Sequence, residues 1–322
     1  MELAVEIAGL QPETLKLTTE WVQHAEKLGC TMAFAAEAWW SDAVTPLAYL
    51  ADKTEKIQLA TGIMQVTART PAMTAMTALT LHDLTNGRFV LGLGASGPQV
   101  VEGLHGTKYN PALTRLKETV DICRMIFRGE KVEYQGKIFQ LPMPNSEGKA
   151  IRIAHKPTDI PIYLATLGPN SLEYTGEVAN GWMGTSFSPD HPEAHFDFLK
   201  RGAEKANRSL EDLNLCVSTR IEIGDDVEAM IEKRKPAVAF NMGGMGSRTT
   251  NFYNDAFKRA GYEEDAVAIQ TLWLAGKRDE AAKRVPDAMV TEFQALGTRD
   301  MIAARLKAYQ EAGVTTLKLG LD

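Results

Sequence analysis

Short apolar runs alternate along this chain with longer segments whose apolar residues recur every three or four positions. The first run, Leu3–Ala8, alternates bulky apolar residues with small or charged ones, as a half-buried strand does. The segment Pro12–Leu28 then has the periodicity of a helix and stops before Gly29, a residue that commonly terminates helices. The chain therefore opens with a strand followed by a helix.

The same unit recurs along the chain. The later strands, each with the helix that follows it, are predicted at 31–37 and 45–54, 57–63 and 72–84, 89–93 and 111–127, 161–167 and 171–179, 182–186 and 193–207, and 213–223 and 299–312, before a last strand at 315–321. Alternating strands and helices predict a parallel sheet. Eight strands in this order favour an α/β fold of the (β/α)8 TIM-barrel type, as one domain over residues 1–322, rather than an open doubly wound sheet.

Two segments interrupt the alternation and are expected to be insertions on the barrel. Within residues 130–159, the run V-E-Y-Q-G-K-I-F-Q-L predicts a rim hairpin that turns at Gln135-Gly136. Residues 226–297 contain helical patterns and the run M-G-G-M-G but no clear strand. They predict an all-helical insertion before the last helix.

Strand alternation also predicts which side chains face the barrel interior. If the bulky residues of the first strand face the helices, the inward set is Ala4, Glu6, Ala8, Ala33, Ala35, Glu37, Arg220, Glu222, Thr316 and Lys318. Buried charges require partners or a ligand. We therefore expect Glu6, Arg220, Glu222 and Lys318 to form an ion network, whereas Glu37 ends its strand at the face where barrels place their chemistry.

The segment 88–106, R-F-V-L-G-L-G-A-S-G-P-Q-V-V-E-G-L-H-G, is the most distinctive stretch of the chain. It contains a G-x-G-x-x-G after a strand, which is one element of a dinucleotide-binding turn. Pro98 and the later glycines, however, are expected to delay the next helix until about Pro111, and no acidic residue ends a second strand at the required spacing. The segment is better interpreted as a loop that a flat or phosphorylated ligand approaches, with a purely structural glycine loop as the alternative.

Two further strand ends have features of a binding site. Gly62 interrupts the apolar run A-T-G-I-M-Q, which indicates either a bulge approached by a ligand or a tight barrel turn. The run A-T-L-G-P-N-S leads into a helix whose first N–H groups, near Gly168 to Ser171, are suited to a phosphate, although a plain turn capped by Asn170 explains it equally well. Thr185-Ser186 end the next strand and are placed to donate to the same phosphate.

Other candidate residues are judged by their positions. His105 and Tyr109 follow the glycine-rich loop on the face expected to hold the site, whereas His82 lies within a predicted helix and is expected to be structural. No Ser-His-Asp order, H-E-x-x-H motif or cysteine pair occurs in a suitable context. The lack of these motifs argues against hydrolases and metalloenzymes, and no metal is expected.

Composition narrows the class of protein further. Hydrophobic residues make up 44% and charged residues 24% of the chain, and the formal net charge is −6, which disfavours nucleic acid as a partner. The start M-E-L-A-V-E-I-A-G-L has no basic leader pattern, and no apolar run reaches the ~18 residues of a membrane span. Cys30, Cys123 and Cys216 are far apart and are expected to be thiols. A cytoplasmic protein is expected.

The run L-G-L-G-A-S-G-P-Q-V-V-E-G-L-H-G, with A-T-G-I-M-Q before it and T-R-L-K-E-T-V-D-I after it, resembles the luciferase-like monooxygenase superfamily. The similarity is greatest to the branch that uses the deazaflavin coenzyme F420 instead of FMN. It extends over nearly the whole chain, because P-I-Y-L-A-T-L-G-P-N-S, F-N-M-G-G-M-G-S-R-T-T-N-F-Y-N-D and G-V-T-T-L-K-L also resemble that branch.

The resemblance implies a (β/α)8 barrel that holds the deazaflavin ring across its carboxyl-terminal mouth. It implies a bulge with a non-prolyl cis peptide behind the ring, which corresponds here to Gly62-Ile63. It also implies coenzyme contacts at Ser96, Gly97 and Pro98, and a phosphate site at Leu167, Gly168, Pro169, Asn170 and Thr185. Several positions inferred from the residue patterns thus coincide with those implied by the resemblance.

The implied chemistry is hydride transfer between C5 of the deazaflavin and a small organic substrate. Glu37 is the candidate acid or base, and Trp39, Trp40, His105 and Tyr109 are candidate substrate-pocket residues. Some relatives carry an Asp-His pair where this chain has A-E-A-W-W-S-D, so the resemblance does not imply a histidine proton donor at this position.

Two other functions remain open alongside an F420-dependent oxidoreductase. One is an FMN-dependent monooxygenase of the same fold, and the other is a coenzyme-binding barrel without catalysis. A homodimer is expected, with a small molecule as substrate and neither nucleic acid nor membrane as partner.

Overall fold

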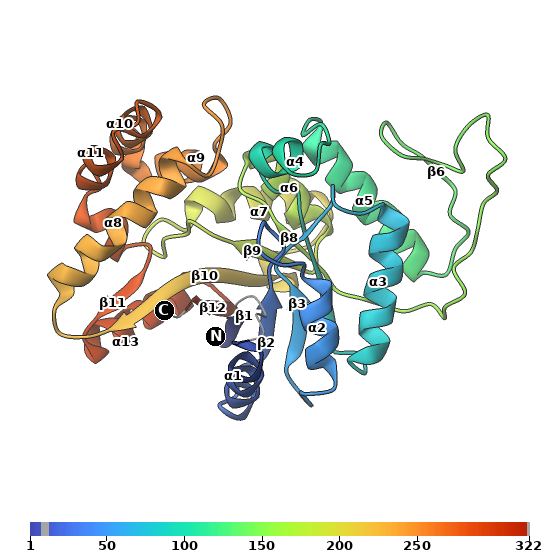
Figure 1. Ribbon diagram of the computed structural model, residues 1–322, viewed down its shortest axis with the longest axis horizontal. Helices are drawn as coiled ribbons and strands as arrows, with labels where there is room; N and C mark the ends of the chain where they lie inside the picture. The colour runs from blue at the N-terminus through green and yellow to red at the C-terminus, as the bar shows by residue number, and fades with distance from the viewer. Residues whose placement is uncertain (8–12, 321–322) are drawn as a thin grey trace. The chain divides into compact units, whose positions relative to one another are not determined.

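The computed structural model describes residues 1–7 and 13–320, and their secondary structure alternates as the sequence predicts. The barrel strands are β1 (Glu2–Ile7), β2 (Met32–Ala35), β3 (Gln58–Thr61), β5 (Phe89–Gly94), β8 (Ile162–Ala165), β9 (Gly181–Gly184), β10 (Asn214–Ile223) and β12 (Thr316–Gly320) (Figure 1). They are hydrogen-bonded in the order β10-β12-β1-β2-β3-β5-β8-β9, and β9 also pairs with β10. This last pairing closes an eight-stranded parallel barrel, and the predicted TIM-barrel fold is confirmed.

Helices follow the strands in turn. They are α1 (Leu15–Lys27), α2 (Val44–Ala51), α3 (Pro71–Leu84), α4 (Pro98–Gly103), α5 (Ala112–Phe127), α6 (Pro169–Val178), α7 (Glu193–Lys205) and α13 (Arg299–Glu311), with a 3-10 turn η1 (Leu210–Asp212) before β10. Helix α4 corrects the expectation that helix formation is delayed to about Pro111. Pro98 occupies the first helical position, where its fixed φ favours a helix start and its missing N–H costs nothing.

Local sequence accounts for the element boundaries. Gly29 has a φ of 89° directly after α1, and Thr70 caps α3 by accepting from the N–H of Met73, with Pro71 next. All six residues of β5 are buried, as in a parallel strand covered on both faces. The predicted limits at Ala8, Pro12 and Leu321 lie outside the described residues.

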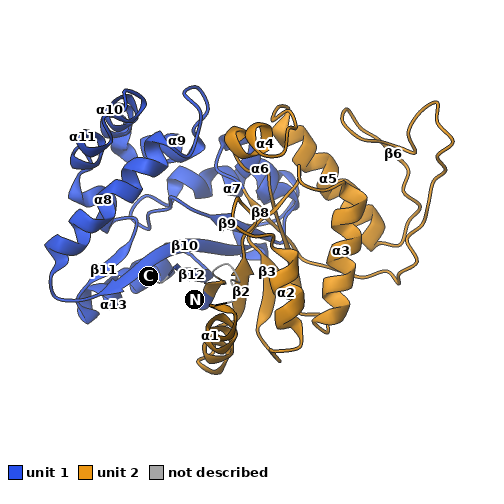
Figure 2. Cartoon of the chain, in the orientation of Figure 1, with its two compact units in different colours: residues 1–4, 166–322 blue, residues 5–165 orange. Residues whose placement is uncertain are grey.

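The chain divides into two compact units, which Figure 2 colours separately. The unit of residues 5–165 contains β2 to β8 with α1 to α5. Its rim hairpin is short, with β6 (Tyr134–Gln135) antiparallel to β7 (Gln140–Leu141), and it turns close to the predicted position. The buried carboxylate of Glu118 on α5 accepts the N–H groups of Lys137, Ile138 and Phe139, which fixes the turn.

The unit of residues 1–4 and 166–322 contains the long insertion. It comprises α8 (Val227–Gly243), α9 (Phe252–Phe257), a π-helical turn η2 (Lys258–Tyr262), α10 (Glu263–Leu274), α11 (Arg278–Lys283), α12 (Asp287–Thr291) and β11 (Ala295–Gly297). Strand β11 corrects the all-helical prediction. It is only three residues long and pairs in parallel with Ile221–Ile223 of β10, so it lacks the length from which a strand pattern can be recognised.

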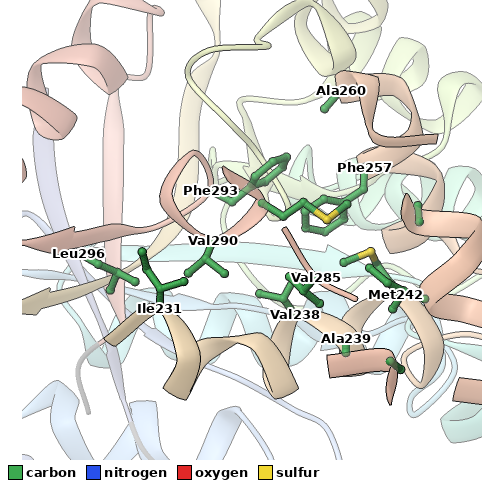
Figure 3. Packing of buried hydrophobic residues seen from close by; sticks show 14 of the residues in the cluster. Ile231, Val238, Ala239, Met242, Phe257, Ala260, Val285, Val290, Phe293 and Leu296 are labelled. Carbon is green, nitrogen blue, oxygen red and sulfur yellow. The ribbon is translucent and has the colours of Figure 1, made fainter. Parts of the chain in front are cut away.

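The insertion has a hydrophobic core of its own. Figure 3 shows it, with Met242, Phe257 and Phe293 among the labelled side chains; the Phe257 and Phe293 ring centroids are 4.3 Å apart. Its fully buried members include Ala239, Ile269 and Met289. The segment is therefore a packed layer rather than a flexible loop.

The predicted ion network of Glu6, Arg220, Glu222 and Lys318 stays a prediction. Glu222 also pairs with two residues of α8: its carboxylate lies 3.0 Å from Nζ of Lys233 and 2.6 Å from Nη2 of Arg234. Arg220 is exposed rather than buried. The end of β10 continues beyond its pairing with β12 and pairs with β11 of the insertion.

Helix α1 is joined to the start of β3 through one carboxylate. Glu26 accepts hydrogen bonds from the N–H groups of Glu55, Lys56 and Ile57 at 2.6–2.9 Å. Partial burial opposes ionisation of Glu26, but these three bonds and the nearby Arg88 outweigh it and lower the pKa of its carboxyl.

We expect Glu26→Gln to destabilise the protein by about 1 kcal/mol at pH 7. Because the folded-state pKa is lowered, this stability is present above the unfolded pKa of 4.5 and is lost as the pH falls through the folded value. Urea unfolding of the wild type and the variant should therefore give curves that converge on acidification. A difference that is the same at pH 7 and pH 3 would contradict the assignment.

Candidate functional site

Among residues 1–7 and 13–320, no helix is long and apolar enough to cross a membrane. Within the same ranges, histidine, cysteine and acidic side chains do not gather in groups of three that would hold a metal ion. The candidate site is therefore built from strand ends, glycines, aromatic rings and a small number of charges.

The end of β3 forms the bulge that the resemblance implies. The Gly62-Ile63 peptide bond is cis, and β4 (Met64–Gln65) then runs parallel to the end of β5. A Cβ added to Gly62 would lie 2.8 Å from Cδ1 of Phe34, and one added to Gly94 would lie 2.6 Å from Cδ1 of Ile63. A side chain at Gly62 would clash with Phe34, whereas one at Gly94 would require only the end of the Ile63 side chain to move. A bulge approached by a ligand and a tight turn both remain compatible with Gly62.

Several hydrogen bonds hold Glu37 against this bulge. Nη1 of Arg69 donates to its two carboxylate oxygens at 2.6 and 2.8 Å, and the N–H of Gln65 donates at 2.9 Å. The backbone N–H of Glu37 also donates to the carbonyl of Ile63, and Nε2 of Gln65 donates to the carbonyl of Glu37. The side chains of Glu37 and Arg69 are 7% and 20% exposed, so the pair is largely removed from water.

These contacts give Glu37 a structural partner that the sequence did not indicate. The carboxylate binds Arg69, which lies 32 residues away in the chain. A buried carboxylate needs a cationic partner, which predicts an arginine or lysine beside Glu37 but does not identify Arg69. The role of Glu37 as proton donor or acceptor stays a prediction.

The two tryptophans after β2 are exposed. Trp39 and Trp40 have 60% and 53% of their surface accessible, and their rings make an edge-to-face pair with centroids 5.2 Å apart. Two exposed tryptophans provide an apolar surface suited to an organic ligand.

The glycine-rich loop after β5 turns sharply at Ser96, whose φ is 59°, and then starts α4 at Pro98 with Gly97 as the N-cap. The loop ends with His105 and Tyr109. Nε2 of His105 is buried and lacks a hydrogen-bond partner among the described residues, and Tyr109 is 7% exposed. A buried ring nitrogen without a partner leaves one polar atom for a ligand to satisfy.

In the other unit, the turn after β8 has an open helix start. Gly168 is the N-cap of α6 and makes no side-chain cap, while Pro169 at the first helical position has no N–H. The alternative that Asn170 caps this helix is wrong, because Asn170 already lies inside α6, where its side chain is past the capping position. The first turn therefore keeps N–H groups suited to an anion.

Residues from the insertion contact this turn. The ring of Phe252 would lie 3.3 Å from a Cβ at Gly168, and Nη2 of Arg259 donates to the carbonyl of Leu167 at 2.8 Å. Neither residue was predicted, because both come from helices whose position the sequence does not reveal. Thr185 follows β9 and is partly exposed.

Comparisons with known proteins agree with this geometry. The luciferase-like monooxygenase family model matches residues 4–316. A Mycobacterium tuberculosis protein, which carries the provisional name of a coenzyme F420-dependent oxidoreductase, is 38% identical over 307 residues, which cover 92% of this chain and 88% of that protein. The 5,10-methylenetetrahydromethanopterin reductase of Archaeoglobus fulgidus is 29% identical over 85% of this chain and 80% of its own.

Solved structures show the same fold. The coenzyme F420-dependent tetrahydromethanopterin reductase of Methanopyrus kandleri aligns with a TM-score of 0.78 at 25% identity, over 98% of this chain and 92% of its own. An FMN-bound type II Baeyer-Villiger monooxygenase of Pseudomonas putida aligns with a TM-score of 0.66 at 18% identity, over 99% and 91% of the two chains. With a family model that matches nearly the whole chain and a close barrel match, this protein belongs to the luciferase-like monooxygenase family.

Proposed function

We propose that this protein is an oxidoreductase that uses coenzyme F420 to transfer a hydride to or from a small organic substrate. The observation that carries the proposal is the 38% identity, over 92% of the chain, with the F420-dependent mycobacterial relative. The barrel fold by itself does not distinguish coenzymes, because an FMN-bound enzyme shares it.

The residues present fit such a coenzyme. Segment 62–65 forms a wall in which Oε1 of the fully buried Gln65 has no hydrogen-bond partner among the described residues, which leaves an acceptor for an N–H of a ligand ring. Ser96, Gly97 and Pro98 present mostly backbone beside the same strand end. Gly168 and Asn170 would hold the phosphate through N–H groups, with Leu167, Pro169 and Thr185 beside them.

The coenzyme would supply the hydride chemistry at C5, so the protein needs to orient the reactants, exclude water and move one proton. The exposed rings of Trp39 and Trp40 and the unpartnered Nε2 of His105 are proposed to contact the substrate, together with Tyr109. We propose that Glu37 holds segment 62–65 in place beside the coenzyme ring through its hydrogen bonds to Gln65. Mutagenesis of Glu37 tests its role in proton transfer separately.

We expect the protein to bind F420 at least tenfold more tightly than FMN, about 1.4 kcal/mol in binding free energy. The physical reason is that segment 62–65 and the glycine-rich loop would face the coenzyme ring mostly with backbone. Few side chains there could move to accommodate a different ring. Fluorescence titration with both coenzymes measures this directly.

Equal or reversed affinities would favour the FMN-dependent monooxygenase. Tight F420 binding without hydride transfer to any of a panel of alcohols, aldehydes, imines and enoates would favour a coenzyme-binding protein. The homodimer remains a prediction that sedimentation can check separately.

A further inference from the structure

The guanidinium of Arg259 bridges two segments beside the predicted phosphate turn. Its Nη2 donates to the carbonyl of Leu167 at 2.8 Å and its Nε donates to the carbonyl of Ala194 at 3.0 Å. Leu167 directly precedes Gly168, and Ala194 lies in the first turn of α7. One side chain of η2 thereby joins the start of α7 to the turn that begins α6.

Holding the carbonyl of Leu167 also orients the next N–H. In a trans peptide the C=O and N–H groups point in opposite directions. Because Arg259 binds the Leu167 oxygen, the N–H of Gly168 is directed away from Arg259. Together with the N–H of Asn170 in the first turn of α6, it belongs to the set of groups that an anion at this helix start would use.

Arg259 is partly buried, and Asp255 is the acid that acts on its charge. Burial lowers the pKa of its guanidinium, and Asp255 acts in the opposite direction. Asp255 itself lies 3.4 Å from Nζ of Lys258, which shares its charge. Burial and the charge of Arg259 lower the pKa of the neighbouring His195 to about 3, so that imidazole is neutral at pH 7. A cation in this half-buried position favours an anion nearby more strongly than a solvated one would.

We propose that Arg259 is a positioning residue for the phosphate of the coenzyme: it orients the Leu167–Gly168 peptide and places a positive charge behind it. The inference rests on the proposed function, since it assumes a phosphate-bearing coenzyme at this turn. It assigns a role in coenzyme recognition to the inserted helical layer, which otherwise packs on its own core.

The test compares F420 with the deazariboflavin that has the same ring but no phosphate. We expect Arg259→Gln to weaken F420 binding at least tenfold and to change the affinity for the phosphate-free ligand less than threefold. Arg259→Lys should retain part of the F420 affinity because it keeps the charge but loses the two-pronged hydrogen bond. Wild-type F420 binding should also weaken more steeply with added salt than binding by Arg259→Gln.

Arg201→Gln is the matched control. Arg201 lies over the Phe198 ring at 4.4 Å, as Arg259 does at 5.7 Å, and its removal changes the net charge equally, but it pairs with Glu173 at an exposed position. Both ligands should bind this control as they bind the wild type.

Three outcomes would overturn the inference, and they differ from one another. If Arg259→Gln and Arg259→Lys weaken both ligands equally and lower the melting temperature, Arg259 is only structural. If the wild type binds both ligands equally, the phosphate is not held at this turn, although F420 dependence stands. If the wild type binds neither, the proposed function fails and the inference fails with it.

Discussion

Glu37→Gln is expected to lower the free energy of unfolding by about 3 kcal/mol, because it leaves the mostly buried guanidinium of Arg69 without its carboxylate. It also removes the charge that accepts the N–H of Gln65. The bulge segment should loosen, so the affinity for the coenzyme ring should fall together with stability. Urea unfolding and fluorescence titration of the same variant measure the two effects.

Arg69→Met completes the test as a double-mutant cycle. Each single substitution leaves one member of the ion pair without its partner, whereas the double variant removes both members. The double variant should therefore be less destabilised than the sum of the two single effects, with a coupling of about 2 kcal/mol. Glu130→Gln, which disrupts the exposed pair with Arg128, is the control and should change stability little.

A different result would restore the catalytic interpretation of Glu37. If Glu37→Gln leaves unfolding and coenzyme binding unchanged and lowers turnover by ~10²-fold or more, the carboxylate transfers the substrate proton. Additive stability effects of Glu37→Gln and Arg69→Met would likewise reject the ion pair as a structural element.

Gly168→Val is expected to weaken F420 binding by roughly 100-fold, or about 2.7 kcal/mol, with a small change in the melting temperature of the protein alone. The backbone of Gly168 has φ −77° and ψ 149°, which a β-branched residue adopts readily. The new side chain meets the ring of Phe252, but that ring is 40% exposed and can move. The side chain would then occupy space beside the N–H groups that the phosphate needs.

Gly148→Val serves as the control, because Gly148 lies in the exposed rim segment with only Ser146 and Pro142 side chains and the Met143 backbone nearby. It should bind F420 as the wild type does. A fall in the stability of Gly168→Val that is as large as the loss of binding would identify Gly168 as a turn residue and move the phosphate site elsewhere.

The barrel was predictable because each strand carries its own evidence. The apolar run at Phe89–Leu93 predicts a strand from its own residues, and the structure buries all of β5. The positions of Gly62 and Gly168 were predictable for the same reason: a glycine that interrupts an apolar run or precedes proline is a local feature.

The contacts that complete the site were not predictable, because they join residues that are distant in sequence. Arg69 and Arg259 look like ordinary surface residues in their own segments, and only the folded chain brings them to Glu37 and Leu167. Strand alternation likewise does not reveal that Glu222 binds Lys233 and Arg234 of α8.

The pairing of β10 with β11 determines how easily this barrel accepts an insertion of a different length. The chain enters the helical layer after Gly224, and the N–H of Gly224 donates to the carbonyl of Gly297 at 2.9 Å where the chain returns. Two ends this close can be joined by a few residues, and the entropy of closing a loop grows only slowly with its length. The layer can therefore be exchanged for a shorter or longer one without shifting the register of the barrel. Such an exchange would remove Phe252 and Arg259 from the turn at Gly168, so the replacement layer would have to supply its own contacts there.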